Sequence, residues 1–227
     1  MTLSLNEYDL ADYLSRQVNM FFPERKDVDI YGTVQKSLDT ALFRLEYCFS
    51  RIKYKGYGEG RKAVFSHLHS DQYCIFLYYL ANSIWREQPE YEDICRKIIG
   101  LNKALNSVWI SYKANLPKVF LVEHPVGTVL GNAAYGEYAY FLHNVTVNTQ
   151  VDNDGKPVGS IGKFLYCSAG ATIIGNENIG DEVTIGVDTV VFRRPIQSRT
   201  LIYRDKDGCI KEKHNHVGFA RQYFYED

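Results

Sequence analysis

The first half of the chain has the hydrophobic spacing of amphipathic helices. Between Leu38 and Ile52, apolar residues recur every three or four positions, with charged residues between them, which is the spacing of one helix face. Residues 71–86 and 91–105 also have helical spacing. The segment 71–86 is apolar nearly all round, so we expect it to be buried on most sides. The pattern predicts an all-helical domain over residues 1–107.

The second half of the chain has a different period. Apolar residues recur at every sixth position, at Ile161, Cys167, Ile173, Ile179, Ile185 and Val191. The same phase runs earlier, through Ile110, Leu116, Val122 and Thr128 and, after a slip of one residue, Tyr135, Phe141 and Val147. A coil with three short strands per turn gives this period, whereas a helix or an ordinary strand does not. The repeat predicts a parallel β-helix over residues 108–227, with the hexad residues pointing inward.

Two segments interrupt the repeat. Residues 148–160 are polar and rich in turn formers, so we expect a loop outside the coil. Residues 195–214 form an insertion, in which Asp207-Gly208 predicts a hairpin turn. Upstream, the glycine-rich and charged segment 53–62 is also expected to be a loop.

Charge and composition exclude several classes of function. The chain has 227 residues and a formal net charge of −1 without a basic block, which argues against nucleic-acid or membrane partners. No signal peptide or membrane-spanning run is evident, so a cytoplasmic protein is expected. The five cysteines are scattered without metal-ligand spacing, and we expect buried, reduced thiols and no metal.

Two segments carry a family resemblance. Residues 123–148 read EHPVGTVLGNAAYGEYAYFLHNVTVN, and residues 168–191 read SAGATIIGNENIGDEVTIGVDTVV. Together they resemble the serine O-acetyltransferase branch of the hexapeptide acyltransferases. The resemblance implies a left-handed coil, acetyl-CoA as co-substrate, and a homotrimer or a hexamer formed from two trimers. VGFAR at 217–221 is similar to the element that closes the family's coenzyme site.

The resemblance also implies roles for individual residues. His124 aligns with the general base, which removes the proton of an acceptor hydroxyl. Glu123 aligns with an acceptor-binding aspartate; the alternative is a solvated carboxylate. His143 could bind the acceptor or the pantetheine arm, or it could be a satisfied histidine of the trimer seam. His67 aligns with an acceptor-binding aspartate of the N-terminal domain.

Small residues and cations are candidates for coenzyme binding. The backbone near Ala169, Gly170 and Gly186 is expected to line the pantetheine groove, because small side chains allow close approach. Arg193 and Arg221 are candidate contacts for coenzyme phosphates, as are Arg194 and Lys213. Each of these cations could instead be a solvated surface residue.

Three positions depart from the family pattern. Trp109 replaces the aspartate that orients the catalytic histidine, His67 replaces an aspartate, and the loop 148–160 lacks the family's histidine and arginine. Either another carboxylate, Glu137 or Asp188 of this or a neighbouring subunit, then orients His124, or the protein is slow or inactive.

The acceptor therefore stays open. It is serine or a similar small molecule, or a hydroxyl on a sugar of a surface polysaccharide precursor. The sugar ring would pack against a set of tyrosines, namely Tyr112, Tyr135, Tyr138 and Tyr140. We expect free L-serine to be a poor substrate and a sugar to be a better one. The alternatives are N-acetylation of a nucleotide-linked amino sugar and a catalytically silent trimeric scaffold.

Overall fold

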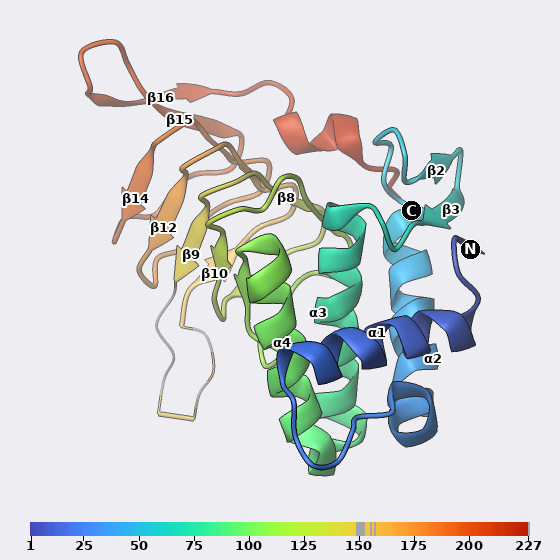
Figure 1. Ribbon diagram of the computed structural model, residues 1–227. Helices are drawn as coiled ribbons and strands as arrows, with labels where there is room; N and C mark the ends of the chain where they lie inside the picture. Colours follow the sequence, from blue (N-terminus) through green and yellow to red (C-terminus); the bar gives the residue numbers. More distant parts are fainter. Residues whose placement is uncertain (149–152, 155, 157, 227) are drawn as a thin grey trace. The chain divides into compact units, whose positions relative to one another are not determined.

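The computed structural model describes residues 1–148, 153–154, 156 and 158–226. It divides into two compact units (Figure 1). The first comprises Met1–Ser50 and Lys55–Lys113, and the second comprises Arg51–Tyr54 and Ala114–Asp227. The predicted domain boundaries, 1–107 and 108–227, differ in detail from these units and stay a prediction. No helix within the described ranges has the length and apolar character to cross a membrane.

Helices dominate the first unit. They are α1 (Glu7–Phe21), α2 (Ile30–Phe49), α3 (Ser70–Glu87), the short 3₁₀ helix η1 (Pro89–Tyr91) and α4 (Glu92–Asn106). The side chains of Asn6 and Asp29 accept hydrogen bonds from the first turns of α1 and α2, which satisfies N–H groups that lack a helical partner. All positions of α3 from Asp71 to Ile84 are buried, so the expected burial of this helix is confirmed.

The prediction that the first unit is all-helical was wrong. It also contains a small sheet of β1 (Thr2–Leu3), β3 (Lys62–Phe65) and β2 (Gly58–Glu59), in that order. Strand β1 runs parallel to β3, and β2 runs antiparallel to it. The segment 53–62, expected to be a loop, therefore contains a strand. Strands β1 and β2 have only two residues each, which is too short for a hydrophobic period to be visible, and β1 pairs some sixty positions away.

The second unit is built from short parallel strands. They are β5 (Phe120–Val122), β6 (Val129–Leu130), β7 (Ala134–Tyr135), β8 (Ala139–Phe141), β9 (Thr146–Asn148), β10 (Ser160–Ile161), β11 (Tyr166–Cys167), β12 (Thr172–Ile174), β13 (Thr184–Ile185), β14 (Val190–Phe192), β15 (Thr200–Arg204) and β16 (Ile210–His214). The two-residue strand β4 (Trp109–Ile110) belongs to the first unit.

These strands stack in three ladders. One ladder has the order β15-β13-β11-β8-β5, the second β14-β12-β9-β6 and the third β10-β7. Within a ladder a strand pairs with the strand one turn later, and this turn is three hexads long where Tyr166 pairs with Thr184 and Thr172 with Val190. The chain therefore returns to the same ladder once per turn, and the predicted parallel-sheet architecture is confirmed.

The hexad residues form the core of this unit. The buried members are Leu116, Val122, Thr128, Phe141, Val147, Ile161, Cys167, Ile173, Ile179, Ile185 and Val191. Successive side chains of a strand point to opposite faces, so one position of each hexad faces the interior. The six-residue spacing correctly predicted these core positions except Tyr135, which is only half-buried.

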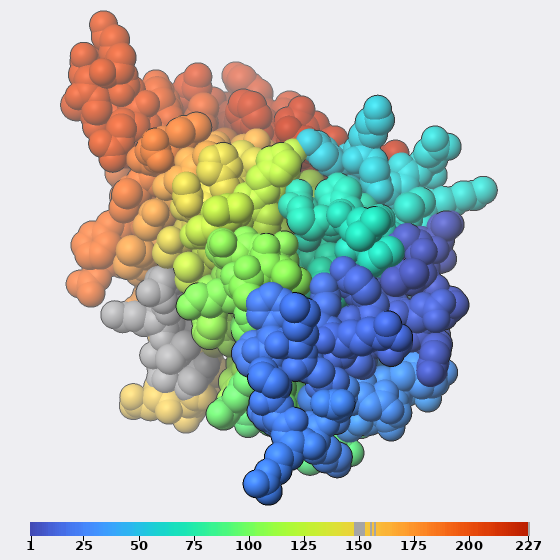
Figure 2. All heavy atoms as spheres, in the orientation of Figure 1, coloured from blue at the N-terminus to red at the C-terminus, as the bar shows by residue number. Residues whose placement is uncertain are grey.

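The insertions differ in how far the structure describes them. Strands β15 and β16 form the predicted hairpin, with antiparallel pairing from Thr200↔His214 to Arg204↔Ile210, and it projects from the surface (Figure 2). Six of the thirteen residues of the predicted loop 148–160 lie outside the described ranges. Of the five cysteines, four are buried as expected, whereas Cys209 in the hairpin is exposed.

Candidate functional site

His124 lies two residues beyond strand β5, at a corner of the coil. Its side chain is exposed, and its φ of 50° is in the left-handed region, which residues other than glycine rarely adopt. The N–H of Val126 donates to the carbonyl oxygen of His124 at 2.7 Å, closing a tight turn. The backbone therefore turns sharply at His124 and presents the imidazole to solvent.

The strand register places His143 at the same corner one turn later. Val122 pairs with Phe141 and Phe141 with Cys167, so His124, His143 and Ala169, each two residues further on, occupy equivalent positions. Adjacent strands lie about 4.8 Å apart. The predicted base and one predicted substrate residue are thus brought together by neighbouring strands, although 19 positions separate them in the sequence.

Small residues follow at the same edge of the ladder. The N–H of Gly170 donates to the carbonyl oxygen of His143 at 3.0 Å, and the N–H of Asp188 donates to that of Ala169 at 2.9 Å. Gly170 has a φ of 71°, and a Cβ there would meet a carboxylate oxygen of Asp188 at 2.0 Å. Gly186 follows β13 on the next turn. The candidate pantetheine residues therefore adjoin the two histidines.

The candidate phosphate-binding arginines lie elsewhere in the unit. Arg193 follows β14 on another ladder and is stacked on Phe192, with its guanidinium carbon 5.3 Å from the ring centroid. Arg194 forms an ion pair with Glu212. The predicted role of these cations in phosphate binding stays a prediction.

Arg221 has strong partners within the protein. It lies in the C-terminal 3₁₀ helix η2 (Phe219–Tyr223) and pairs with Glu182 at 3.1 Å. The Glu182 side chain is only 8% exposed, and it also accepts a hydrogen bond from the N–H of Gly218 at 3.3 Å. Arg221 holds the pKa of Glu182 below its ordinary value of 4.5. This pair ties the VGFAR element to the coil.

We expect Arg221→Gln to destabilise the fold more than it weakens coenzyme binding. The nearly buried Glu182 would lose its main partner, at a cost of about 1–2 kcal/mol after allowance for the partly exposed guanidinium. Because the folded-state pKa of Glu182 is lowered, the stability from this pair is present above about pH 4.5 and is lost as the pH falls. Urea denaturation of the variant and the wild type at pH 7 and pH 3.5 measures both effects.

Arg193→Gln is the matched control, because it removes an exposed arginine without a carboxylate partner among the described contacts. Its free energy of unfolding should stay within about 0.5 kcal/mol of the wild type. An Arg221→Gln protein of unchanged stability that binds coenzyme at least tenfold more weakly would instead assign Arg221 to the phosphates.

Two predicted acceptor residues already have protein partners. Tyr54 and Tyr140 each donate a hydroxyl hydrogen bond to one carboxylate oxygen of Glu123. His67 belongs to the first unit, where its Nδ1 lies 2.8 Å from the hydroxyl oxygen of Ser4. Its ring also packs edge-on against Tyr13, with centroids 5.0 Å apart. The acceptor-binding roles of Glu123 and His67 stay predictions, and the structure gives both side chains another use.

The candidate orienting carboxylates are engaged differently. The carboxylate of Glu137 accepts a hydrogen bond from the N–H of Val119 at 3.1 Å, whereas Asp188 is exposed at the corner after β13. Trp109, where the family pattern has an aspartate, lies under the ammonium of Lys103 at 5.6 Å from the ring centroid. Trp109 therefore supplies no carboxylate to orient His124, and the carboxylate of Glu137 is already bound to a backbone N–H.

The four tyrosines expected to face a sugar also have internal partners. Tyr112 donates to Glu92 and Tyr135 to the carbonyl of Gly131. Tyr138 stacks on Phe164 with ring centroids 4.7 Å apart, and Tyr140 donates to Glu123. Packing therefore accounts for these rings, and they no longer favour a sugar over other acceptors.

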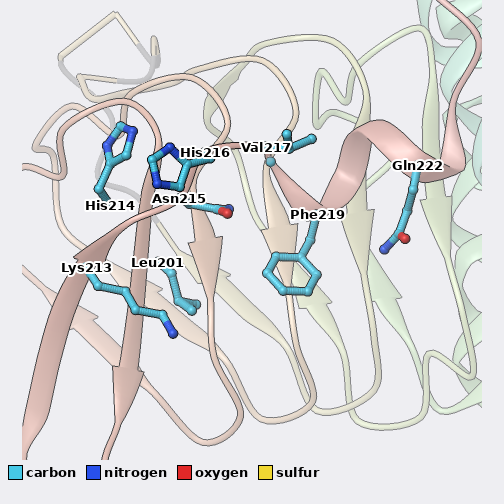
Figure 3. Close-up of a pocket in the computed structure, with 9 residues that line it drawn as sticks. Leu201, Lys213, His214, Asn215, His216, Val217, Phe219 and Gln222 are labelled. Carbon is cyan, nitrogen blue, oxygen red and sulfur yellow. The ribbon is translucent and has the colours of Figure 1, made fainter.

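A pocket lies between the hairpin and the C-terminal segment. Its volume is about 520 Å³, and it is lined by Leu201, Lys213, His214, Asn215, His216, Val217, Gly218, Phe219 and Gln222. Figure 3 shows the side chains of Lys213, Phe219 and Gln222 directed to the same side of the segment. On that side an aromatic ring and a cation could meet the base and the phosphates of a nucleotide, whereas the rings of His214 and His216 are directed to the other side of the segment. Among the residues that line the pocket, Lys213 and the first residues of the VGFAR element were candidates for coenzyme binding from the sequence, whereas the pocket itself was not predicted.

Comparison with known proteins agrees with this arrangement. No protein-family model matches the chain. The chain is 31% identical over 110 residues to the serine acetyltransferase of Synechococcus elongatus, covering 48% of this chain and 45% of that protein. It is 25% identical over 126 residues to the serine acetyltransferase of Helicobacter pylori, covering 55% and 72%.

The chain is similar to the serine acetyltransferases. The crystal structure of the Neisseria gonorrhoeae serine acetyltransferase superposes on it with a TM-score of 0.68 at 17% identity, over 92% of this chain and 80% of that one. The structural match shows a shared fold, a helical N-terminal region followed by a region rich in parallel sheet. The predicted resemblance is confirmed. The chain spans less than half the length of the Synechococcus relative.

Proposed function

We propose that the protein is an O-acetyltransferase of the serine acetyltransferase type that uses acetyl-CoA. The observation that carries this proposal is the shared corner of the coil, where the strand register stacks His124, His143 and Ala169. An exposed imidazole beside small residues suits a base at the end of a groove for an extended thioester. The sequence similarity to serine acetyltransferases supports the same reaction.

The chemistry follows from the weakness of a hydroxyl as a nucleophile. His124 would accept the proton of the acceptor hydroxyl as its oxygen attacks the acetyl carbonyl carbon, and would then return that proton to the leaving thiolate. Acetyl-CoA supplies the activated acetyl group. Direct transfer is expected, because Cys167, the cysteine closest to this corner in sequence, is a hexad residue whose thiol has its pKa raised by complete burial.

The coenzyme would extend from this corner to the C-terminal pocket. Its pantetheine arm would pass the backbone of Ala169, Gly170 and Gly186, and its nucleotide would enter the pocket beside Phe219 and Lys213. The coil would be left-handed, as the family resemblance implies and against the usual rule for parallel crossovers. The cytoplasmic location stays a prediction.

A test of the reaction is the release of thiol from acetyl-CoA in the presence of an acceptor panel. L-serine, related hydroxy amino acids, nucleotide-linked amino sugars and free sugars are compared at equal concentration. Hydroxyl-dependent thiol release supports the proposal, and release only with amines favours N-acetylation. No release with any acceptor favours a silent scaffold, which Trp109 and the backbone-bound Glu137 also favour.

We also propose a homotrimer, in which the ladder β14-β12-β9-β6 faces a second copy. Its outer surface exposes Val129, Val190 and Phe192, with 36%, 43% and 56% of each residue accessible. Val129 and Val190 lie at the two ends of one row of paired residues across the ladder, in the order Val129, Thr146, Thr172 and Val190. Exposed apolar side chains gathered on one sheet are typical of an interaction surface.

We expect light scattering to return the mass of a trimer, or of a hexamer if helical units also associate. Replacing Phe192 and Val190 together by glutamate should give a folded monomer, because like charges and lost apolar area would both oppose association. Val64→Glu, at an exposed apolar position of the first unit, is the control and should keep the trimer. A wild-type protein that is a stable monomer at micromolar concentration would contradict the trimer.

A further inference from the structure

Both oxygens of the Glu123 carboxylate are already occupied. The Tyr54 hydroxyl donates to Oε1 and the Tyr140 hydroxyl donates to Oε2. Hydrogen bonds to an ionised carboxylate are among the stronger ones in proteins. A ligand ammonium that took these oxygens would have to displace both hydroxyls, leaving partly buried donors without partners.

The two tyrosines reach Glu123 from distant parts of the sequence. Tyr140 is in β8, on the strand next to β5, and lies diagonally opposite Glu123, because Val122 pairs with Phe141. Tyr54 ends the segment Arg51–Tyr54, which belongs to the second unit although its chain neighbours on both sides belong to the first. A separate short segment is therefore placed against the coil and brings one hydroxyl to Glu123.

The C-terminal segment holds Arg51–Tyr54 in place. The N–H of Lys53 donates to the carbonyl of Tyr223, and the N–H of Tyr225 donates to that of Arg51, both at 2.8 Å. Ile52 and Phe224 form an antiparallel bridge between these bonds. The segment is thus fixed at each of its first three residues, which fixes Tyr54.

The same C-terminal segment packs on Tyr140. The Tyr223 ring lies 4.6 Å from the Tyr140 ring and 6.0 Å from the Tyr166 ring, measured between centroids. Burial, together with the hydrogen bond to Glu123, raises the pKa of Tyr140, so its hydroxyl stays protonated and can donate. Rigid donors on both sides leave the Glu123 side chain little freedom.

We propose that Glu123 is a positioning residue for His124, fixed by Tyr54 and Tyr140, and does not bind the acceptor. The inference rests on the proposed role of His124 as the base. His124 is the next residue in the chain, at a left-handed corner, and the N–H of Glu123 is bound to the carbonyl of Phe141 at 2.9 Å. The side chain and the backbone of Glu123 are therefore both held by hydrogen bonds, directly beside the corner from which the His124 side chain projects.

A residue that positions the imidazole of His124 affects kcat more than it affects substrate binding. A displacement of about 1 Å at a reacting group can cost about a hundredfold in rate. A carboxylate that only bound the acceptor would instead act on KM when its binding was altered. The two roles of Glu123 thus predict different kinetic effects from the same substitutions.

The test compares Tyr54→Phe, Tyr140→Phe and Glu123→Gln with Tyr73→Phe. The control removes a hydroxyl that donates to Gln17 at 2.6 Å in the first unit, so it matches the loss of one buried hydrogen bond. We expect kcat to fall about 10- to 100-fold in the first three variants. The acceptor KM and the coenzyme Kd, from calorimetry, should change less than threefold, and Tyr73→Phe should keep the wild-type kcat.

A second measurement does not depend on turnover. In protein labelled with ¹⁵N-histidine, the imidazole signals of His124 are identified by their loss in His124→Gln. We expect one sharp set in the wild type and in Tyr73→Phe, and broadened or doubled signals in Tyr54→Phe and Tyr140→Phe. A wild type without turnover would therefore refute the proposed function and still leave the positioning role measurable.

Two outcomes overturn the inference. One is a raised acceptor KM with wild-type kcat at saturation, which would assign Glu123 to the acceptor. The other is a set of unchanged His124 signals in the Tyr54 and Tyr140 variants, with or without a lower melting temperature. This result would mean that Tyr54, Tyr140 and Glu123 only pack against one another and do not position His124.

Discussion

His124→Ala should lower kcat by about 10²–10⁴-fold, the usual cost of losing a general base. Coenzyme binding should survive, because the candidate pantetheine groove is formed by the backbone around Gly170 and Gly186. The exposed position of His124 also means that the substitution removes few packing contacts, so the variant should fold. Thiol release from acetyl-CoA measures the rate, and calorimetry measures the coenzyme Kd.

His143→Ala provides the sharpest comparison, because His143 lies at the same corner one turn further along the coil. We expect it to raise the acceptor KM and to lower kcat less than tenfold. A reversed order, with His143→Ala the slower variant, would assign the base to His143. Near-normal turnover in both variants would show that neither histidine of this corner takes part in the reaction.

The repeat could be predicted from the sequence because each turn of the coil uses the same inward position. Ile161, Cys167 and Ile173 satisfy one steric rule, which is to fill the interior at a corner where the chain turns. The rule acts locally, so it is visible as a period. It also fixed the register, and through the register it brought His124 next to His143 at one edge of the ladder.

Contacts between distant segments could not be predicted in this way. Tyr54 lies 69 positions before Glu123, in a segment whose glycines and charges indicated only a loop. The ion pair between Glu182 and Arg221 joins two charged residues that, taken singly, are typical of a solvated surface. Nothing in the composition of either segment marks its partner.

The structure also changes how the acceptor site is understood. The family resemblance assigned Glu123 and His67 to the acceptor, yet Glu123 is bound by two tyrosines and His67 lies beside Ser4. Trp109 supplies no charge in place of the family's aspartate. The groups expected to recognise the ammonium and carboxylate of an amino acid are therefore occupied or missing among the described residues, although the chain is similar in sequence to enzymes named for serine.

We therefore expect L-serine to be acetylated, but poorly, with a kcat/KM below the ordinary enzymatic range of about 10⁴ M⁻¹s⁻¹. Charged ends of a bound amino acid that lack partners cost several kcal/mol, which corresponds to a loss of about 10²-fold or more. The loss should appear in KM, since the charged groups bind the ground state and the transition state alike.

Steady-state kinetics with L-serine, L-serine methyl ester and N-acetyl-L-serine locate the loss. If the protein lacks partners for both charged ends, neutralising either charge should raise kcat/KM, by about tenfold or more, because the cost of desolvating an unpaired charge is removed. A tenfold or larger drop with the N-acetyl compound would reveal an ammonium site and return Glu123 to the acceptor. A kcat/KM for L-serine above 10⁴ M⁻¹s⁻¹, with strong discrimination against both derivatives, would establish a complete serine site. It would contradict the prediction that serine binds weakly because Glu123 is occupied by tyrosines.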